Sequence, residues 1–203
     1  MRIPIKPIVI FIFIIGLLSG FTIGILFPFI GRSYFNLYFM DVKIYAGEFS
    51  QRFGMWGNII SILSRNLVLI SILILGPYII ANSYIGKYKD PKKSLLLFTI
   101  CSIFTYGFFP YGLFLGNLYA SLNKDLFFKW ILYFIPHGIL ETIVVLWAGS
   151  TAIYIEELFV NRRGHNIVTA DYIFRRLFFA CAYLLIATII ETIISPHFYM
   201  IVL

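Results

Sequence analysis

Long apolar segments alternate with short polar segments along the whole chain. The apolar runs span about residues 8–30, 58–81, 95–120, 130–155 and 177–195. Because an α-helix rises about 1.5 Å per residue, about 20 apolar residues cross the hydrocarbon core of a bilayer. The pattern predicts an all-α membrane protein, a polytopic bundle of about five transmembrane helices.

The polar interval between the first two runs has a periodicity of its own. Phe35, Phe39, Val42 and Phe49 recur at helical spacing among charged residues. This spacing predicts an amphipathic helix that lies in the membrane interface. No Pro/Gly/Ser-rich linker divides the chain, so we expect residues 1–203 to form a single integral membrane domain.

Small residues mark one face of the first predicted crossing. Gly16, Ser19, Gly20 and Gly24 recur at a spacing near four residues. Residues at this spacing share one face of a helix, and small side chains there let another helix approach closely. The stripe predicts a tight helix–helix contact.

Prolines and glycines interrupt three of the other runs. Gly76 and Pro77 predict a kink in the second crossing, and Pro110 interrupts the third. In the fourth crossing Pro136 frees a carbonyl one turn earlier, and Gly138 lets a neighbouring backbone come close. Together Pro136 and Gly138 predict a locally opened helix.

Composition agrees with a membrane location. Hydrophobic residues make up 61% of the chain and charged residues 12%, about half the charged share of a soluble domain. The net charge of +7 comes from basic residues dispersed between apolar runs, without an aromatic-basic recognition motif. We therefore expect the lipid bilayer, and no nucleic acid, as the partner of these charges.

The basic residues also predict an orientation. Ten of the 16 Lys and Arg residues fall in the N-terminus and in the intervals 82–94 and 156–176, which five crossings place on one side. Basic loops stay in the cytoplasm. We therefore expect a multi-pass protein of the cell membrane, with a cytoplasmic N-terminus and a C-terminus outside.

Two ionisable residues stand out in the fourth crossing. His137 and Glu141 are four residues apart, so they share one helix face about 6 Å apart along the axis. Ionisable side chains inside a membrane are costly and often mark function. The positions of His137 and Glu141 along the fourth crossing place both residues in the outer half of the bilayer. Asn66, Asn117 and Glu191 lie in that half as well, near the outer ends of their crossings. These residues predict an intramembrane polar cluster drawn from four helices.

Three interpretations of the cluster stay open. His137, Glu141 and Glu191 can form a hydrogen-bonded clamp between the fourth and fifth crossings. Alternatively the carboxylates titrate, with His137 as a shuttle, in a transport or proton-relay site. A metal or hydrolase site is the third. The HExxH motif needs two histidines on one helix, and His197 lies in the terminal segment, so we predict no metal, cofactor or catalytic residue.

The chain contains four short sequence elements: Arg65-Asn66 followed by Gly76, the pair Gly116-Asn117, PHGILE at 136–141, and IIETIISP at 189–196. Through these elements it resembles the stage II sporulation protein M family, a family of integral membrane proteins. The resemblance implies a polytopic membrane protein without an assigned catalytic activity. It also implies that His137, Glu141, Asn66, Asn117 and Glu191 are motif positions. The family's namesake acts at a septal membrane with two peptidoglycan-degrading partners, and we do not carry sporulation over to this chain.

These observations together predict a non-enzymatic, polytopic component of a membrane complex. The expected partners are the bilayer and either further copies of the chain or other membrane proteins. The alternative is a small transporter or channel in which His137, Glu141 and Glu191 relay protons or ions through the membrane.

Overall fold

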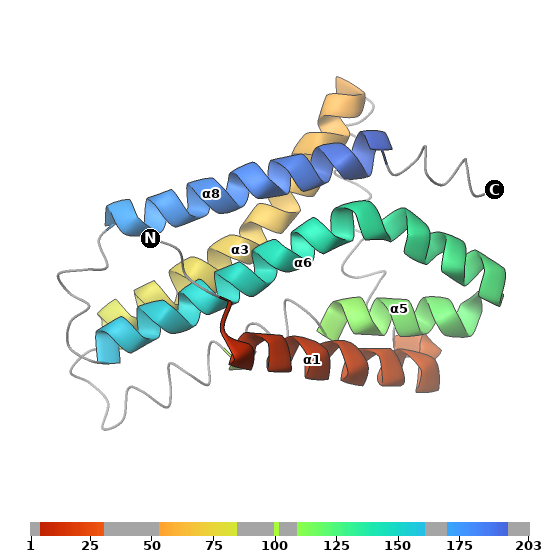
Figure 1. Cartoon of the computed structure of the whole chain (residues 1–203), viewed down its shortest axis with the longest axis horizontal. Coiled ribbons are helices and arrows are strands. Elements are labelled where there is room, and N and C mark those ends of the chain that lie inside the picture. The colour runs from red at the N-terminus through yellow and green to blue at the C-terminus, as the bar shows by residue number, and fades with distance from the viewer. Residues whose placement is uncertain (1–4, 31–52, 85–99, 102–108, 161–169, 195–203) are drawn as a thin grey trace.

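The computed structural model describes residues 5–30, 53–84, 100–101, 109–160 and 170–194, and within these ranges it is helical without a strand. The helices are α1 (Pro7–Leu26), α3 (Met55–Tyr84), α5 (Phe109–Ser121), α6 (Lys124–Val160) and α8 (Ala170–Ile189), followed by the π-helical turn η2 (Ile190–Ile194) (Figure 1). The all-α prediction is confirmed for the described residues.

Four described helices are long and apolar enough to cross a membrane: Pro7–Leu26, Met55–Ile79, Phe134–Leu158 and Asp171–Ile194. They correspond to the first, second, fourth and fifth predicted crossings. Of the third, 95–120, the structure describes residues 100–101 and the 13-residue α5. Alone, α5 is about 20 Å long, shorter than the hydrocarbon core. The amphipathic helix predicted between the first two crossings falls mainly on 31–52, outside the described residues.

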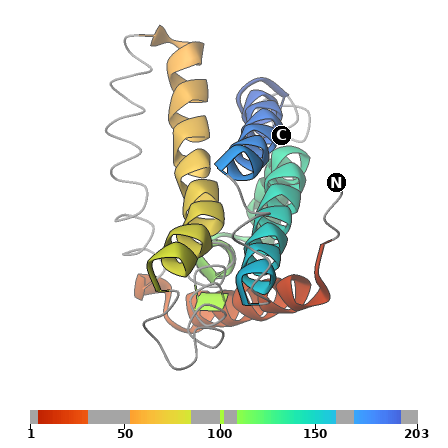
Figure 2. The same cartoon turned by 90° about the vertical axis from the view of Figure 1, so that its left-hand side faces the viewer.

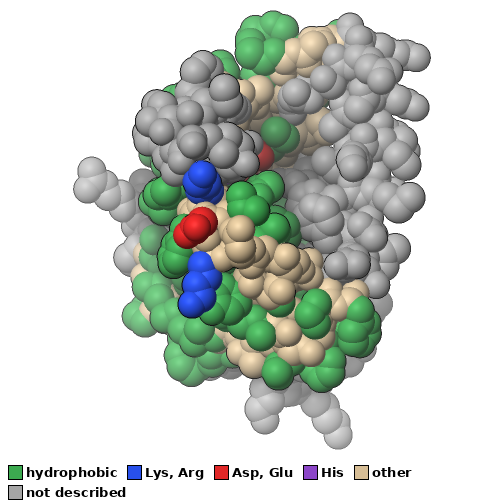
Figure 3. All heavy atoms as spheres, turned by 90° about the vertical axis from the view of Figure 1, so that its right-hand side faces the viewer, with side chains coloured by type: hydrophobic (Ala, Val, Ile, Leu, Met, Phe, Trp, Pro, Cys, Tyr) green, Lys and Arg blue, Asp and Glu red, His purple; other side chains and the backbone are tan. Residues whose placement is uncertain are grey.

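The surface of these helices is apolar, as a lipid environment requires. Large hydrophobic side chains that are more than half exposed include Phe11, Leu18, Val68, Phe174 and Phe178. The face on the right-hand side of Figure 1 shows mostly hydrophobic side chains and few charged ones among the described residues (Figure 3). Exposed apolar area on this scale is unfavourable in water and normal against lipid. The chain therefore has the surface of a helical membrane protein.

The polar interval 156–176 was predicted to be a connection, and that prediction is wrong at both ends. Helix α6 continues to Val160, and α8 already begins at Ala170. In the first turn of α8, Arg175 Nε lies 2.9 Å from Asp171 Oδ2, an ion pair four residues apart that supports helix. Both side chains are about 70% exposed, so the helix ends extend to where charges can meet water or headgroups.

The connection between α5 and α6 is shorter than predicted. Helix α6 begins at Lys124, six residues before the predicted start of the crossing at 130. Asn123 explains this start, because its Oδ1 accepts a hydrogen bond from the backbone N–H of Leu126 at 2.8 Å. An asparagine in this position satisfies one of the unpaired donors at a helix N-terminus.

Helices α3, α6 and α8 form one packed group. The ends of α3 and α6 lie near the start of α8 at the left of Figure 1, so α8 runs antiparallel to both, and Figure 2 shows the three side by side. Their shared core consists of buried aliphatic residues: Ile70, Leu73, Ile74, Val144, Val145, Ala148, Ile155, Ala180 and Leu184. The group brings together one face of each of three predicted crossings.

Helices α1 and α5 form a second, closely packed pair. Gly16, Gly20 and Gly24 are buried on α1, and Gly112 and Gly116 are buried on α5. A Cβ added at Gly20 would lie 2.8 Å from the backbone nitrogen of Leu113, and one at Gly116 would lie 3.1 Å from the Cα of Gly24. The two backbones are therefore in direct contact, which confirms the tight contact predicted from the small-residue stripe.

The start of α1 is also attached to α6. The backbone N–H of Lys6 donates to Ser150 Oγ at 3.0 Å, and Lys6 Nζ lies 2.5 Å from Glu157 Oε2. The α1–α5 pair is thereby fixed at one end of the three-helix group. This geometry puts the beginning of α1 at the same end of the molecule as the end of α6.

Replacing Gly116 tests the α1–α5 contact. Because its missing side chain faces the backbone of α1, Gly116→Leu must separate the helices, and we expect it to lower the free energy of unfolding by about 2 kcal/mol. The matched control is Ala120→Leu, one turn further along α5 at an exposed position, which should change stability little. Unfolding in SDS followed by circular dichroism measures both, and equal effects would contradict the contact.

Candidate intramembrane polar site

Glu141 of α6 is the centre of a polar contact between three helices. Its side chain is 4% exposed. Asn66 Nδ2 of α3 donates a hydrogen bond to Glu141 Oε1, and the Tyr111 hydroxyl of α5 donates to Glu141 Oε2 at 3.2 Å. Each carboxylate oxygen therefore has a donor, and the two donors come from different helices.

This contact lies at the depth of the hydrocarbon core. Glu141 is seven residues into the span Phe134–Leu158, about 10 Å by helical rise, and Asn66 is eleven residues into Met55–Ile79, about 16 Å. At such depth water is scarce, and a buried carboxylate or amide without partners costs several kcal/mol. The mutual hydrogen bonds thus offset much of the cost of placing these groups in the membrane.

His137 lies one turn before Glu141 on the same face, and it is 2% exposed. Its ring packs edge-on against Phe134, with 4.9 Å between centroids and an interplanar angle of 71°. Phe134 in turn lies 5.9 Å from the Tyr111 ring. An aromatic layer therefore joins the histidine to the phenol that donates a hydrogen bond to Glu141.

Pro136 and Gly138 do not open the helix. Helix α6 stays α-helical through both residues, and Figure 1 shows it changing direction in its N-terminal part. A bend of this kind is the usual effect of an internal proline, here Pro136. At Gly138 a Cβ would lie 3.0 Å from Cζ of Phe134, so the glycine makes room for the aromatic ring of its own helix rather than for a neighbouring backbone.

Glu191 lies in the π-helical turn η2, which contacts both α6 and α3. These are the helices that carry Glu141 and Asn66. Single π-turns are rare and are often found at functional sites. The turn that holds Glu191 therefore contacts the two helices that carry the site, and convergence of the Glu191 side chain with Glu141 stays a prediction.

Asn117 occupies a different place. Its backbone nitrogen would lie 2.9 Å from a Cβ at Gly24, within the α1–α5 contact, and its Oδ1 accepts a hydrogen bond from Ser121 Oγ at 3.4 Å on the surface. Of the five residues predicted to converge, Asn66 and Glu141 form a direct hydrogen bond, and His137 lies one helical turn before Glu141. Asn117 instead belongs to the helix pair next to them.

Tyr111 and Phe134 were not predicted as site residues. The chain has 14 tyrosines and 22 phenylalanines, so residue type alone does not distinguish either one. The position of Tyr111 beside Gly112 is the sequence feature from which Tyr111 could have been predicted as a site residue. Since neighbouring residues point about 100° apart on a helix, a glycine that faces α1 turns Tyr111 toward a different helix.

Three buried hydroxyl groups on α6 and α8 are satisfied within their own helices. The hydroxyls of Ser150, Thr151 and Thr188 donate to the carbonyl oxygens of Leu146, Trp147 and Leu184, four residues earlier in each case. Over the described ranges no group of three His, Cys, Asp or Glu side chains is placed to hold a metal ion.

Comparisons with family models, with curated proteins and with solved structures found no match for this chain. The described residues include four helices long and apolar enough to cross a bilayer, which is compatible with a helical membrane protein.

Substitution of Glu141 tests the role of its two hydrogen bonds. Glu141→Ala removes the acceptor of both hydrogen bonds, so we expect the free energy of unfolding to fall by about 1–3 kcal/mol. Glu141→Gln keeps an acceptor and adds a donor, and it should lower that free energy by less than about 1 kcal/mol.

The matched control is Glu157→Gln on the same helix. Glu157 is 55% exposed in its ion pair with Lys6, and exposed pairs contribute little to stability. Unfolding in SDS compares the three variants. A loss in Glu141→Gln as large as that in Glu141→Ala would show that the charge, rather than hydrogen bonding, is what the fold needs.

Proposed function

We propose that this chain is a non-enzymatic, multi-pass component of a complex in the cell membrane, with its N-terminus in the cytoplasm. Its intramembrane polar site acts as a clamp that holds the helices in register. The proposal draws on the hydrogen bonds of Glu141, on the exposed apolar surface and on the distribution of Lys and Arg.

One observation is the main support for the clamp. Both oxygens of Glu141 accept hydrogen bonds, one from Asn66 on α3 and one from Tyr111 on α5. A carboxylate that is fully used by neighbouring helices stabilises one arrangement of those helices. The sequence suggested a clamp between the fourth and fifth crossings, whereas these bonds join the fourth crossing to α3 and α5.

The motifs that carry the clamp also support the family proposal. Asn66, His137 and Glu141 are among the positions through which the sequence resembles the stage II sporulation protein M family. We propose that the chain belongs to that family and shares its character as a membrane component that works with partner proteins. The resemblance supplies no substrate and no catalytic step.

Purification from native membranes tests this proposal. A component of a complex should be extracted in mild detergent as a particle larger than one 23.5 kDa chain plus its micelle. That particle should contain a stoichiometric partner or further copies of the chain. Cross-linking in the intact membrane before extraction controls for loss of the partner. A monomer in both preparations would contradict the proposal.

A second candidate is an intramembrane proton or ion relay. It is favoured by the two buried ionisable residues His137 and Glu141, which lie one turn apart on α6, and by the π-helical turn that brings Glu191 to the same helices. In that case Glu141 takes up and releases protons. Its deprotonated state accepts the hydrogen bonds from Asn66 and Tyr111, and this state alternates with a protonated one.

Proton flux into proteoliposomes separates the two candidates. A relay predicts flux in the wild type that Glu141→Gln abolishes, since an amide cannot titrate in this range. The clamp predicts no difference between the wild type and Glu141→Gln. A pH-sensitive dye inside the vesicles provides the measurement, and Glu157→Gln serves as the control because its carboxylate lies outside the site.

A further inference from the structure

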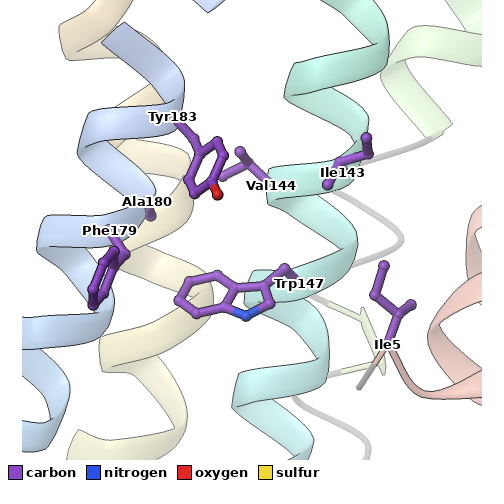
Figure 4. A pocket seen from close by; sticks show the side chains of 7 residues that line it. All are labelled: Ile5, Ile143, Val144, Trp147, Phe179, Ala180 and Tyr183. Carbon is purple, nitrogen blue, oxygen red and sulfur yellow. The ribbon is translucent and has the colours of Figure 1, made fainter. Parts of the chain in front are cut away.

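A groove lies between α6 and α8, beside the start of α1. Its volume is about 220 Å³, and it is lined by Ile5, Ile143, Val144, Trp147, Phe179, Ala180 and Tyr183. Figure 4 shows the Trp147 and Tyr183 rings facing each other between the two helices, with Ile5 beside the start of α1. None of these residues belongs to the polar site around Glu141.

The position of the groove determines what can fill it. Its walls belong to the spans Phe134–Leu158 and Asp171–Ile194, and its residues on α8 are eight to twelve positions into that span. By helical rise this is about 12–18 Å, within the hydrocarbon core. Apart from the indole N–H and the phenol hydroxyl, the lining side chains are apolar. The medium at this depth is the acyl chains of lipids.

A charged group stands directly at the groove. The guanidinium carbon of Arg176 lies 5.4 Å from the centroid of the Trp147 ring, and 5.0 Å from that of Tyr172. Arg176 is five residues into its span, about 7 Å, which is several ångströms nearer the membrane surface than the groove itself. A cation held on aromatic rings at this level is placed where lipid headgroups lie.

The charged residues described at this end of the molecule differ in their contacts. Lys6 pairs with Glu157 and Arg175 pairs with Asp171, whereas Arg176 lies over the rings of Trp147 and Tyr172 at the groove. A guanidinium has five N–H donors, so Arg176 can contact a phosphate while it keeps other contacts. A hydrophobic groove below this guanidinium matches a lipid that has an apolar chain below an anionic headgroup.

We propose that the groove between α6 and α8 binds one anionic phospholipid. One acyl chain lies between Trp147 and Tyr183, and the phosphate lies at Arg176. The volume accommodates a part of one acyl chain, because it exceeds the roughly 150 Å³ of an apolar cavity that holds benzene. A lipid bound here fills the space between the two helices, and this site is independent of the clamp at Glu141.

Tryptophan fluorescence tests the proposal on the full chain. The chain has three tryptophans, and replacing Trp56 and Trp130 by Phe leaves Trp147 as the reporter in the groove. The protein is placed in vesicles that contain either phosphatidylglycerol or phosphatidylcholine with brominated acyl chains, which quench a nearby indole. We expect phosphatidylglycerol to quench Trp147 with about a five-fold higher relative affinity, as one basic residue at an anionic surface provides.

Neighbouring arginines provide the matched pair of variants. Arg176→Gln should abolish the preference for phosphatidylglycerol, whereas Arg175→Gln should keep it, because Arg175 pairs with Asp171 at an exposed position. Equal quenching by the two lipids in the starting protein would overturn the proposal, as would a preference that survives Arg176→Gln.

A third variant keeps the test decisive if Arg176→Gln fails to fold. Ile143 is 47% exposed at the rim, and Ile143→Phe should fill the groove and reduce quenching by both lipids. Unchanged quenching in this variant would show that the lipid that reaches Trp147 does not occupy the groove, and that result also overturns the proposal.

Discussion

The burial of one carboxylate in the membrane constrains much of this structure. Glu141 lies about 10 Å into its span, where an unpartnered charge costs several kcal/mol. Its two oxygens are satisfied by an amide on α3 and a phenol on α5. Because hydrogen bonds need a particular distance and direction, the three helices must present particular faces to one another. Apolar packing alone, which lipid can replace, does not select those faces as sharply.

Helix α5 connects this polar contact to the rest of the bundle. Gly112 and Gly116 bring its backbone against that of α1, and Tyr111 directs a hydroxyl at Glu141. Adjacent positions on one helix thus serve two interfaces, because they point about 100° apart. Close backbone contact fixes the α1–α5 pair. The Tyr111 hydroxyl joins that pair to the α3–α6–α8 group at Glu141, in addition to the contacts of Lys6 with α6. The histidine and the aromatic layer around Phe134 complete the junction.

The sequence predicted the helices better than it predicted their contacts. Run length and hydropathy located four of the crossings, and the small-residue stripe located the close helix contact. Asn66, His137 and Glu141 were recognisable because polar residues are rare in apolar runs. The rotation of each helix about its axis was not recognisable, so Asn117 was assigned to the cluster and Tyr111 was missed. The helix ends at Val160 and Ala170 were missed because charged segments are compatible with both helix and loop.

The hydrogen bond between Asn66 and Glu141 should stabilise the bundle through a direct interaction of the two side chains. A double-mutant cycle measures this interaction, from the unfolding free energies of Asn66→Leu, Glu141→Met and the double variant in the same micelles. We expect a coupling energy of about 1 kcal/mol, within the range found for hydrogen bonds between membrane helices. Additive effects, with a coupling near zero, would contradict it.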